Sequence, residues 1–297
     1  MMRNWQVVVA AVLVVFGVPA ALFFAQPDPV ARQESTAGRF VFTAWEGPDL
    51  PVYYQLPDRV TSTTPVVFVM HGVKRDADRY RDEWAGLARQ YGFIVVVPQF
   101  SQADFPGSRG YNTGYFSEQD GTPRPRSRWS FAAIEPLFDD VRQRFGTCAP
   151  RYSIYGHSAG GQFVHRFVLF MPEARIDQAI SANAGWYTMP DLQTDFPYGL
   201  ADAPVDESAL TAALGKRMTV LLGTADTNRQ DPNLRKTPET DAQGLHRFAR
   251  GQAFFARARQ AAKVHGVALA WSMRTVPGVG HRNGQMAQAA APLLVDN

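Results

Sequence analysis

The sequence contains almost no cysteine. Cys148 is the only one among 297 residues, so no disulfide can form within the chain. The HExxH pattern and the GxxxxGK[ST] phosphate-binding loop are both absent, and no spacing of Cys, His and carboxylates suggests a zinc site. The chemistry of this protein is therefore predicted to need no metal and no organic cofactor.

The chain also lacks a large excess of positive or negative charge. Lys and Arg number 30 against 27 Asp and Glu, which gives a net charge of +3 with the basic residues scattered along the chain. This balance does not indicate a nucleic-acid partner. The composition, 45% hydrophobic and 19% charged, is that of an ordinary globular protein, and α/β domains of this length are common.

Long hydrophobic runs are absent apart from one, at the N-terminus. Residues 6–25 contain no charged side chain and follow Arg3. About 20 apolar residues can span a bilayer, so this segment is either an uncleaved anchor helix or a signal peptide cleaved near Val18-Pro19-Ala20. Both interpretations predict export, to a secreted form or to one tethered to the membrane through residues 6–25. Residues 26–38 are polar, include two prolines and are interpreted as a linker.

From residue 39 onward, apolar runs alternate with amphipathic stretches. This rhythm predicts an α/β fold with a mostly parallel central sheet and helices on both faces. The first two runs, 39–45 and 50–56, are interpreted as an antiparallel pair. The other predicted strands are 65–70, 93–98, 151–156, 178–185, 217–223 and 267–276. The predicted helices are 76–90, 131–145, 159–171, 241–263 and 285–294.

One short motif joins a predicted strand to a predicted helix. Gly156-His157-Ser158-Ala159-Gly160 has the form G-x-S-x-G. At such a corner the serine occupies a strained backbone conformation that exposes its hydroxyl, and the glycines allow the strand and the helix to approach. Ser158 is therefore predicted to be a nucleophile.

A serine hydroxyl needs a base, and the base needs a carboxylate that orients it. His281 follows the last predicted strand on a glycine-rich loop, and Asp226 directly follows the strand 217–223. The chain order Ser, Asp, His is the one expected for this type of fold. The other five histidines are interpreted as packing or helix-capping residues.

Acyl transfer also needs two donors for the oxyanion. The backbone amide after the nucleophile, Ala159, is the first candidate, and the amide of Val73, on the loop after the strand 65–70, is the second.

Two further regions could contact substrate. The stretch 98–130 is rich in Gly, Pro and aromatic residues and is interpreted as a loop that covers the substrate, with Tyr111 as a binding residue. Trp186 and Tyr187 follow the strand 178–185 and are candidates for the pocket wall, although a tryptophan in the core would be equally ordinary there.

The motifs MHGV, GHSAGG, GTADT and GVGH together resemble those of serine esterases of the α/β-hydrolase superfamily, over residues 65–297. The stretches PVVFVMHGVKRDADRYRDEW and SANAGWYTMPD are similar to secreted polyhydroxybutyrate-depolymerase-like and feruloyl-esterase-like enzymes. Such enzymes often carry a Cys after the HG and use disulfides, whereas this chain has Val73 there and a single cysteine.

The resemblance and the motifs predict a catalytic domain over residues 39–297 that hydrolyses carboxylic esters, small or polymeric, through Ser158, His281, Asp226 and an acyl-enzyme. An exported peptidase, amidase or acyltransferase could use the same three residues. A non-catalytic binding protein on the same scaffold would be expected to have lost one of them.

Overall fold

The structure is a computed structural model that describes residues 1–2 and 36–295. The predicted apolar segment 6–25 lies outside the described residues, as does most of the predicted linker. The described residues 36–295 form one compact unit. Within the described ranges, no helix combines the length and apolarity needed to cross a bilayer.

The unit is built on a sheet whose strands run in the order β1-β2-β4-β3-β5-β6-β7-β8. The first two strands are antiparallel to their neighbours, and β3 to β8 are parallel, which confirms the predicted sheet. The strands are β1 (Ala37–Phe42), β2 (Leu50–Gln55), β3 (Val66–Met70), β4 (Ile94–Pro98), β5 (Tyr152–His157), β6 (Ile176–Ala182), β7 (Met218–Gly223) and β8 (Trp271–Val276). Strand β1 begins two residues before the predicted start of the domain.

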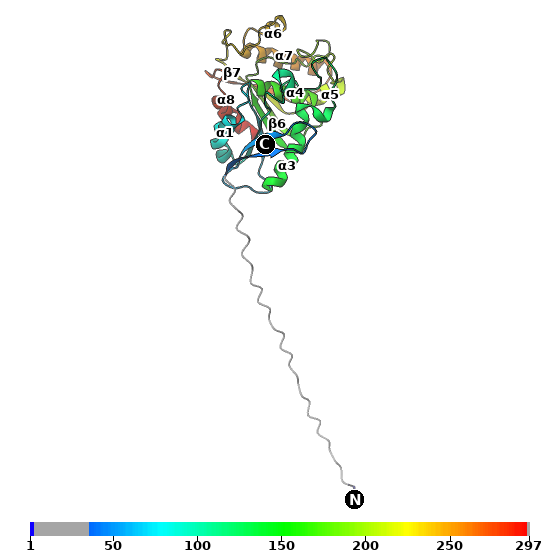
Figure 1. The fold of residues 1–297 in the computed structure, drawn as a ribbon, viewed down its shortest axis with the longest axis vertical. Helices are drawn as coiled ribbons and strands as arrows, with labels where there is room; N and C mark the ends of the chain where they lie inside the picture. Colours follow the sequence, from blue (N-terminus) through cyan, green and yellow to red (C-terminus); the bar gives the residue numbers. More distant parts are fainter. Residues whose placement is uncertain (3–35, 296–297) are drawn as a thin grey trace. The chain divides into compact units, whose positions relative to one another are not determined.

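Helices cover both faces of the sheet (Figure 1). One face carries α1 (Ala77–Tyr91), α8 (Asn283–Ala290) and η3 (Ala291–Leu294). The other carries α3 (Ile134–Phe145), α4 (Ala159–Phe170), α5 (Glu207–Leu214) and α7 (Arg247–Val264). Alternate side chains of β3 enter opposite cores, Val67 and Val69 on one side and Phe68 on the other. Burial on both faces explains the continuous apolar runs of the central strands.

The helix predicted at 241–263 is two helices, α6 (Pro238–Gln243) and α7. Gly244 has φ +143°, a conformation that only glycine adopts readily, and it interrupts the helical path. His246 then caps α7 by accepting a hydrogen bond from the amide of Ala249 at 3.2 Å. The helical pattern of apolar residues continues across this break, so the pattern alone predicts one helix where the caps make two.

The stretch 98–130 forms a wall that hydrogen bonds tie to the rest of the fold. It contains the short segments α2 (Gly107–Gly110) and η1 (Arg126–Arg128) and is followed by η2 (Ser130–Ala133). Arg75 is buried, and its guanidinium donates to the carbonyl oxygens of Phe100, Phe105 and Gly107 at 2.6, 3.1 and 2.8 Å. Tyr111 is 1% exposed and donates its hydroxyl proton to the carbonyl oxygen of His71 at 2.9 Å. These bonds fasten the stretch to the turn that follows β3.

Candidate active site

Ser158 occupies the sharp corner between β5 and α4. Its backbone angles are φ +60° and ψ −117°, a region that residues with a side chain rarely adopt. The two motif glycines permit the corner. A Cβ on Gly160 would lie 2.0 Å from the carbonyl oxygen of Met70, and one on Gly156 would lie 2.2 Å from the carbonyl oxygen of Gly160. Strand β3, strand β5 and helix α4 therefore meet backbone to backbone beneath the serine.

Replacing Gly160 with alanine is expected to destabilise the fold by about 3 kcal/mol, because the new methyl group would collide with main chain that cannot move aside. Urea unfolding measures the change. Gly86→Ala is the control, since a Cβ there meets nothing within 4 Å on the face of α1, and the added helix propensity should stabilise by up to about 1 kcal/mol. Equal stability of the two variants would contradict the close approach at Gly160.

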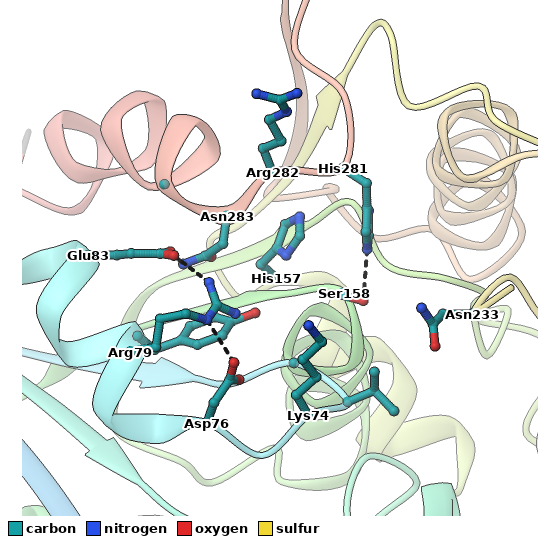
Figure 2. A pocket seen from close by; sticks show the side chains of 14 residues that line it. Lys74, Asp76, Arg79, Glu83, His157, Ser158, Asn233, His281, Arg282 and Asn283 are labelled. Carbon is teal, nitrogen blue, oxygen red and sulfur yellow. Dashed lines mark hydrogen bonds and ion pairs between the residues drawn. The ribbon is translucent and has the colours of Figure 1, made fainter. Parts of the chain in front are cut away.

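Three side chains far apart in the sequence meet at the carboxyl end of the sheet. Nε2 of His281 lies 3.0 Å from Oγ of Ser158, and Nδ1 lies 2.7 Å from Oδ2 of Asp226. Asp226 follows β7 and is 2% exposed, and His281 lies on the loop between β8 and α8. With the ring proton on Nδ1, His281 donates to the carboxylate and accepts from the serine hydroxyl. Figure 2 shows the imidazole directed at Ser158, with Asn233 to one side.

The buried carboxylate of Asp226 has a cationic neighbour. Nη1 of Arg247, at the start of α7, lies 3.6 Å from Oδ1 of Asp226 and 2.8 Å from Oδ2 of Asp231. Arg247 is itself 2% exposed. A buried charged group is costly unless it is compensated, so the proximity of Arg247 offsets the cost of burying the Asp226 side chain beside the imidazole.

His157 packs against the side of the His281 ring. The two ring centroids are 4.5 Å apart, and His157 is 3% exposed. Burial, reinforced by the proximity of His281, holds the pKa of His157 well below its usual value, so its ring stays neutral. Its Nε2 has no hydrogen-bond partner among the described residues. His157 is thus a packing residue, as the sequence indicated, and the group that it packs against is His281.

The two predicted oxyanion donors border the same space as the serine. Val73 and Ala159 both line a cavity that also contains Ser158. Within the described part of the chain, neither backbone amide donates a hydrogen bond to another group. His71 holds the turn before Val73, because its Nε2 accepts from the amide of Phe100 at 3.0 Å while Nδ1 donates to the carbonyl oxygen of Gly72 at 3.1 Å.

The burial of His71 makes the fold sensitive to acid. Burial, followed by the charge of Arg75, lowers the pKa of His71 from 6.5 to about 3. Between pH 6.5 and about pH 3, the unfolded chain binds a proton at His71 that the folded chain does not bind. Above pH 6.5 His71 is neutral in both states and costs the fold nothing, and below it protonation of the unfolded chain lowers the stability of the fold. The free energy of unfolding should therefore decrease by up to about 1.4 kcal/mol per pH unit for this group.

Urea unfolding of His71→Gln between pH 7 and pH 4 tests this linkage. The variant should show a shallower pH dependence than the parent protein. His265→Gln is the control, because His265 is half-buried and pairs with Glu207 at 2.8 Å on the surface. An unchanged slope in His71→Gln would show that His71 does not contribute to the acid sensitivity.

Comparison with known proteins finds similar solved structures. No protein-family profile and no curated protein matches the chain. Among solved structures, poly(aspartic acid) hydrolase-1 from Sphingomonas sp. KT-1 is 51% identical, with a TM-score of 0.86 over 88% of this chain and 98% of that one. LpqC, a poly(3-hydroxybutyrate) depolymerase from Bordetella parapertussis, is 35% identical, with a TM-score of 0.81 over 86% and 90% of the two chains.

The chain belongs to the family of these two relatives, the α/β-hydrolase-fold serine hydrolases. The resemblance seen in the sequence motifs is thereby confirmed, and the eight-stranded sheet agrees with it. An S-formylglutathione hydrolase from Agrobacterium tumefaciens is 19% identical, with a TM-score of 0.58 over 87% of this chain and 92% of that one, and shares the fold alone.

The residues predicted to contact substrate do not all line the cavity of the hydrolase. Trp186 is 3% exposed and lines a cavity at Ser158. Tyr111 lines the same cavity, with its hydroxyl occupied by His71. Tyr187 does not reach it. The tyrosine is fully buried with its ring stacked on Phe254, 4.4 Å between centroids. Its assignment to the pocket was wrong.

Sequence reasoning missed several residues of the site. Asn233 and Arg235 lie on the loop after β7, where no pattern in the sequence distinguishes them. Gln162 and Arg247 also line the cavity at Ser158. Gln162 was accessible to prediction, since it lies four residues after Ser158 on the predicted helix and therefore on the same face.

Proposed function

We propose that the protein cleaves carboxylic ester bonds, with Ser158 as nucleophile, His281 as base and Asp226 as its orienting carboxylate. The observation that carries this proposal is the continuous line of contacts, 3.0 Å from Ser158 to His281 and 2.7 Å from His281 to Asp226. The relative that depolymerises poly(3-hydroxybutyrate), a polyester, supports the choice of bond.

In the proposed reaction, Oγ of Ser158 attacks the carbonyl carbon while its proton passes to Nε2 of His281. The amides of Val73 and Ala159 bind the oxyanion of the tetrahedral intermediate. The intermediate collapses to an acyl-enzyme, and His281 returns the proton to the departing alcohol. Water then attacks the acyl group in the same way, and free acid and the original hydroxyl result.

Amide hydrolysis in an acidic polymer is the second candidate. The relative of 51% identity is a poly(aspartic acid) hydrolase, and poly(aspartic acid) is a polyamide with carboxylate side chains. The cavities at Ser158 are bordered by Lys74, Arg235 and Arg282, none of which has a carboxylate within 4.0 Å in the described part of the chain. Unpaired cations beside a nucleophile favour an anionic substrate.

Two substrates offered in parallel test both candidates. A short 4-nitrophenyl ester reports ester hydrolysis, and poly(aspartic acid) followed by size-exclusion chromatography reports amide hydrolysis. Turnover of the ester alone supports the first proposal, and chain shortening of the polymer supports the second. If a folded sample hydrolyses neither substrate, the result would favour a non-catalytic binding protein. Added alcohol that diverts most of the acyl group from water would indicate an acyltransferase.

We further propose that the enzyme acts outside the cytoplasm, exported through residues 6–25. The uncharged run behind Arg3 supports this location. Mass analysis of the mature N-terminus distinguishes a cleaved signal from a retained anchor. Recovery of the full chain in the cytoplasmic fraction would contradict export.

A further inference from the structure

Two cavities meet at Ser158 and share Val73, Ser158 and Asn233. The first, shown in Figure 2, has a volume of about 490 Å³. The second has a volume of about 270 Å³. The first is also lined by Lys74, Asp76, Arg79, Glu83, His281 and Arg282. The second is also lined by Tyr111, Gln162, Trp186, Arg235 and Arg247.

The position of His281 assigns the two halves of a substrate to the two cavities. The leaving group must receive a proton from Nε2 of His281, so it must lie on the side of that ring. His281 lines the first cavity and not the second. The acyl portion of the substrate therefore extends into the second cavity, past Ala159.

The two cavities differ in their charge. The first contains Asp76 and Glu83, both paired with Arg79. The second is lined by no carboxylate at all. Among its arginines, Arg75 is bound to carbonyl oxygens and Arg247 to Asp231, as described above.

Arg235 is the remaining cation of the second cavity, and it has no carboxylate within 4.0 Å among the described residues. Arg235 acts on Glu239 only from a greater distance, by adding to the lowering of the Glu239 pKa that a hydrogen bond to Thr237 causes. Its guanidinium carbon lies 4.7 Å from the ring centroid of Trp186 and 5.4 Å from that of Tyr198. These rings attract and position the cation without neutralising it. A planar guanidinium held in this way is suited to pair with a carboxylate.

A neutral donor faces the same space. Nδ2 of Asn112 donates to Oε1 of Gln162 at 2.8 Å, which orients the Gln162 amide. The buried guanidinium of Arg166 fixes both residues by donating to their backbone carbonyl oxygens at 3.0 and 3.2 Å. Gln162 is 7% exposed, and its Nε2 donates to no acceptor in the described part of the chain. An oriented and unused donor thus borders the acyl cavity.

We propose that the second cavity binds a carboxylate carried by the acyl portion of the substrate, through Arg235 and Nε2 of Gln162. This inference rests on the proposed function, and it applies to an ester or to an amide. The preferred acyl groups are those of dicarboxylic acids, in which one carboxyl group is esterified or amidated and the other is free.

Matched ester pairs test the proposal. Monomethyl esters of succinic, glutaric and adipic acid are compared with methyl butyrate, pentanoate and hexanoate, and acid release is titrated at constant pH. The parent enzyme should favour at least one acidic ester by about tenfold in kcat/KM over the neutral ester of the same length, the value of one charge-assisted contact. Arg235→Gln should reduce that ratio to near one, and Arg235→Lys should retain part of it. Gln162→Leu should reduce the ratio less than Arg235→Gln.

Lys236→Gln is the control variant. It removes the same charge from the next position, which is exposed and lines neither cavity, so its ratio should equal that of the parent. Equal loss in Lys236→Gln and Arg235→Gln would overturn the proposal in favour of a general charge effect. A parent ratio near one for all three chain lengths would also overturn it.

Binding separates this inference from the proposed function. Glutarate and pentanoate are titrated calorimetrically into the folded Ser158→Ala variant, which needs no turnover. Tighter binding of glutarate that is lost in the Ser158→Ala, Arg235→Gln double variant supports the carboxylate site even if the parent hydrolyses no ester. Equal binding of the two acids would overturn the carboxylate site while leaving ester hydrolysis intact.

Discussion

Replacing Ser158 with alanine is expected to lower kcat by about 10⁴- to 10⁶-fold, because the reaction loses the atom that forms the acyl-enzyme. The hydroxyl makes one of the two hydrogen bonds of the His281 ring, which is also packed against His157. Thermal unfolding should therefore change little. Labelling with a fluorophosphonate probe should disappear along with turnover of a 4-nitrophenyl ester.

Labelling of Ser158→Ala at the level of the parent enzyme would remove Ser158 from the mechanism. Ser153→Ala is a matched control, because this serine lies on the same strand, β5, and is 5% exposed on the way to the corner. The control should keep its labelling. A loss of labelling in both variants, with intact folding, would point to a different nucleophile or to a distorted strand.

Replacing Asp226 with asparagine is expected to lower kcat by about 10⁴-fold at neutral pH. The carboxylate accepts the Nδ1 proton of His281 at 2.7 Å and thereby leaves Nε2 free to accept the serine proton. An amide group can instead donate to Nδ1, and the ring proton then moves to Nε2, where it blocks proton transfer. Steady-state kinetics on a short ester measure the loss.

Asp231→Asn is the control for Asp226→Asn. Asp231 shares the guanidinium of Arg247 but makes no hydrogen bond to His281 in the described structure. This variant should lose less than about tenfold in kcat, since the charge that changes acts on His281 without a hydrogen bond and is partly screened by solvent. If Asp226→Asn keeps its activity within tenfold of the parent enzyme, a different group must orient His281.

The fold was predictable because its central strands are buried on both faces and its elements alternate regularly. The runs 65–70 and 217–223 correspond to β3 and β7 almost residue for residue. In a parallel sheet the ends of such strands lie along one edge, so Ser158, Asp226 and His281 could be placed together from their positions after strands alone.

The substrate cavities could not be predicted in the same way. Arg235 and Asn233 lie on an irregular loop, whose path depends on contacts distant in sequence rather than on a periodic pattern. Tyr187 was placed in the pocket because it follows a strand end, but which of two consecutive side chains turns inward depends on backbone geometry. The break at Gly244 was missed because its effect depends on a positive φ that the sequence does not specify.

The anchoring of the 98–130 stretch by Arg75 has a consequence for how substrate arrives. Three carbonyl oxygens of this stretch accept from one buried guanidinium, so the wall above the nucleophile belongs to the rigid body of the enzyme. Ser158 borders two cavities that are already open, and no segment of the described residues has to swing away first. Turnover should therefore rise smoothly with the amount of dissolved ester, without the abrupt increase at an oil–water boundary that flap-covered lipases display.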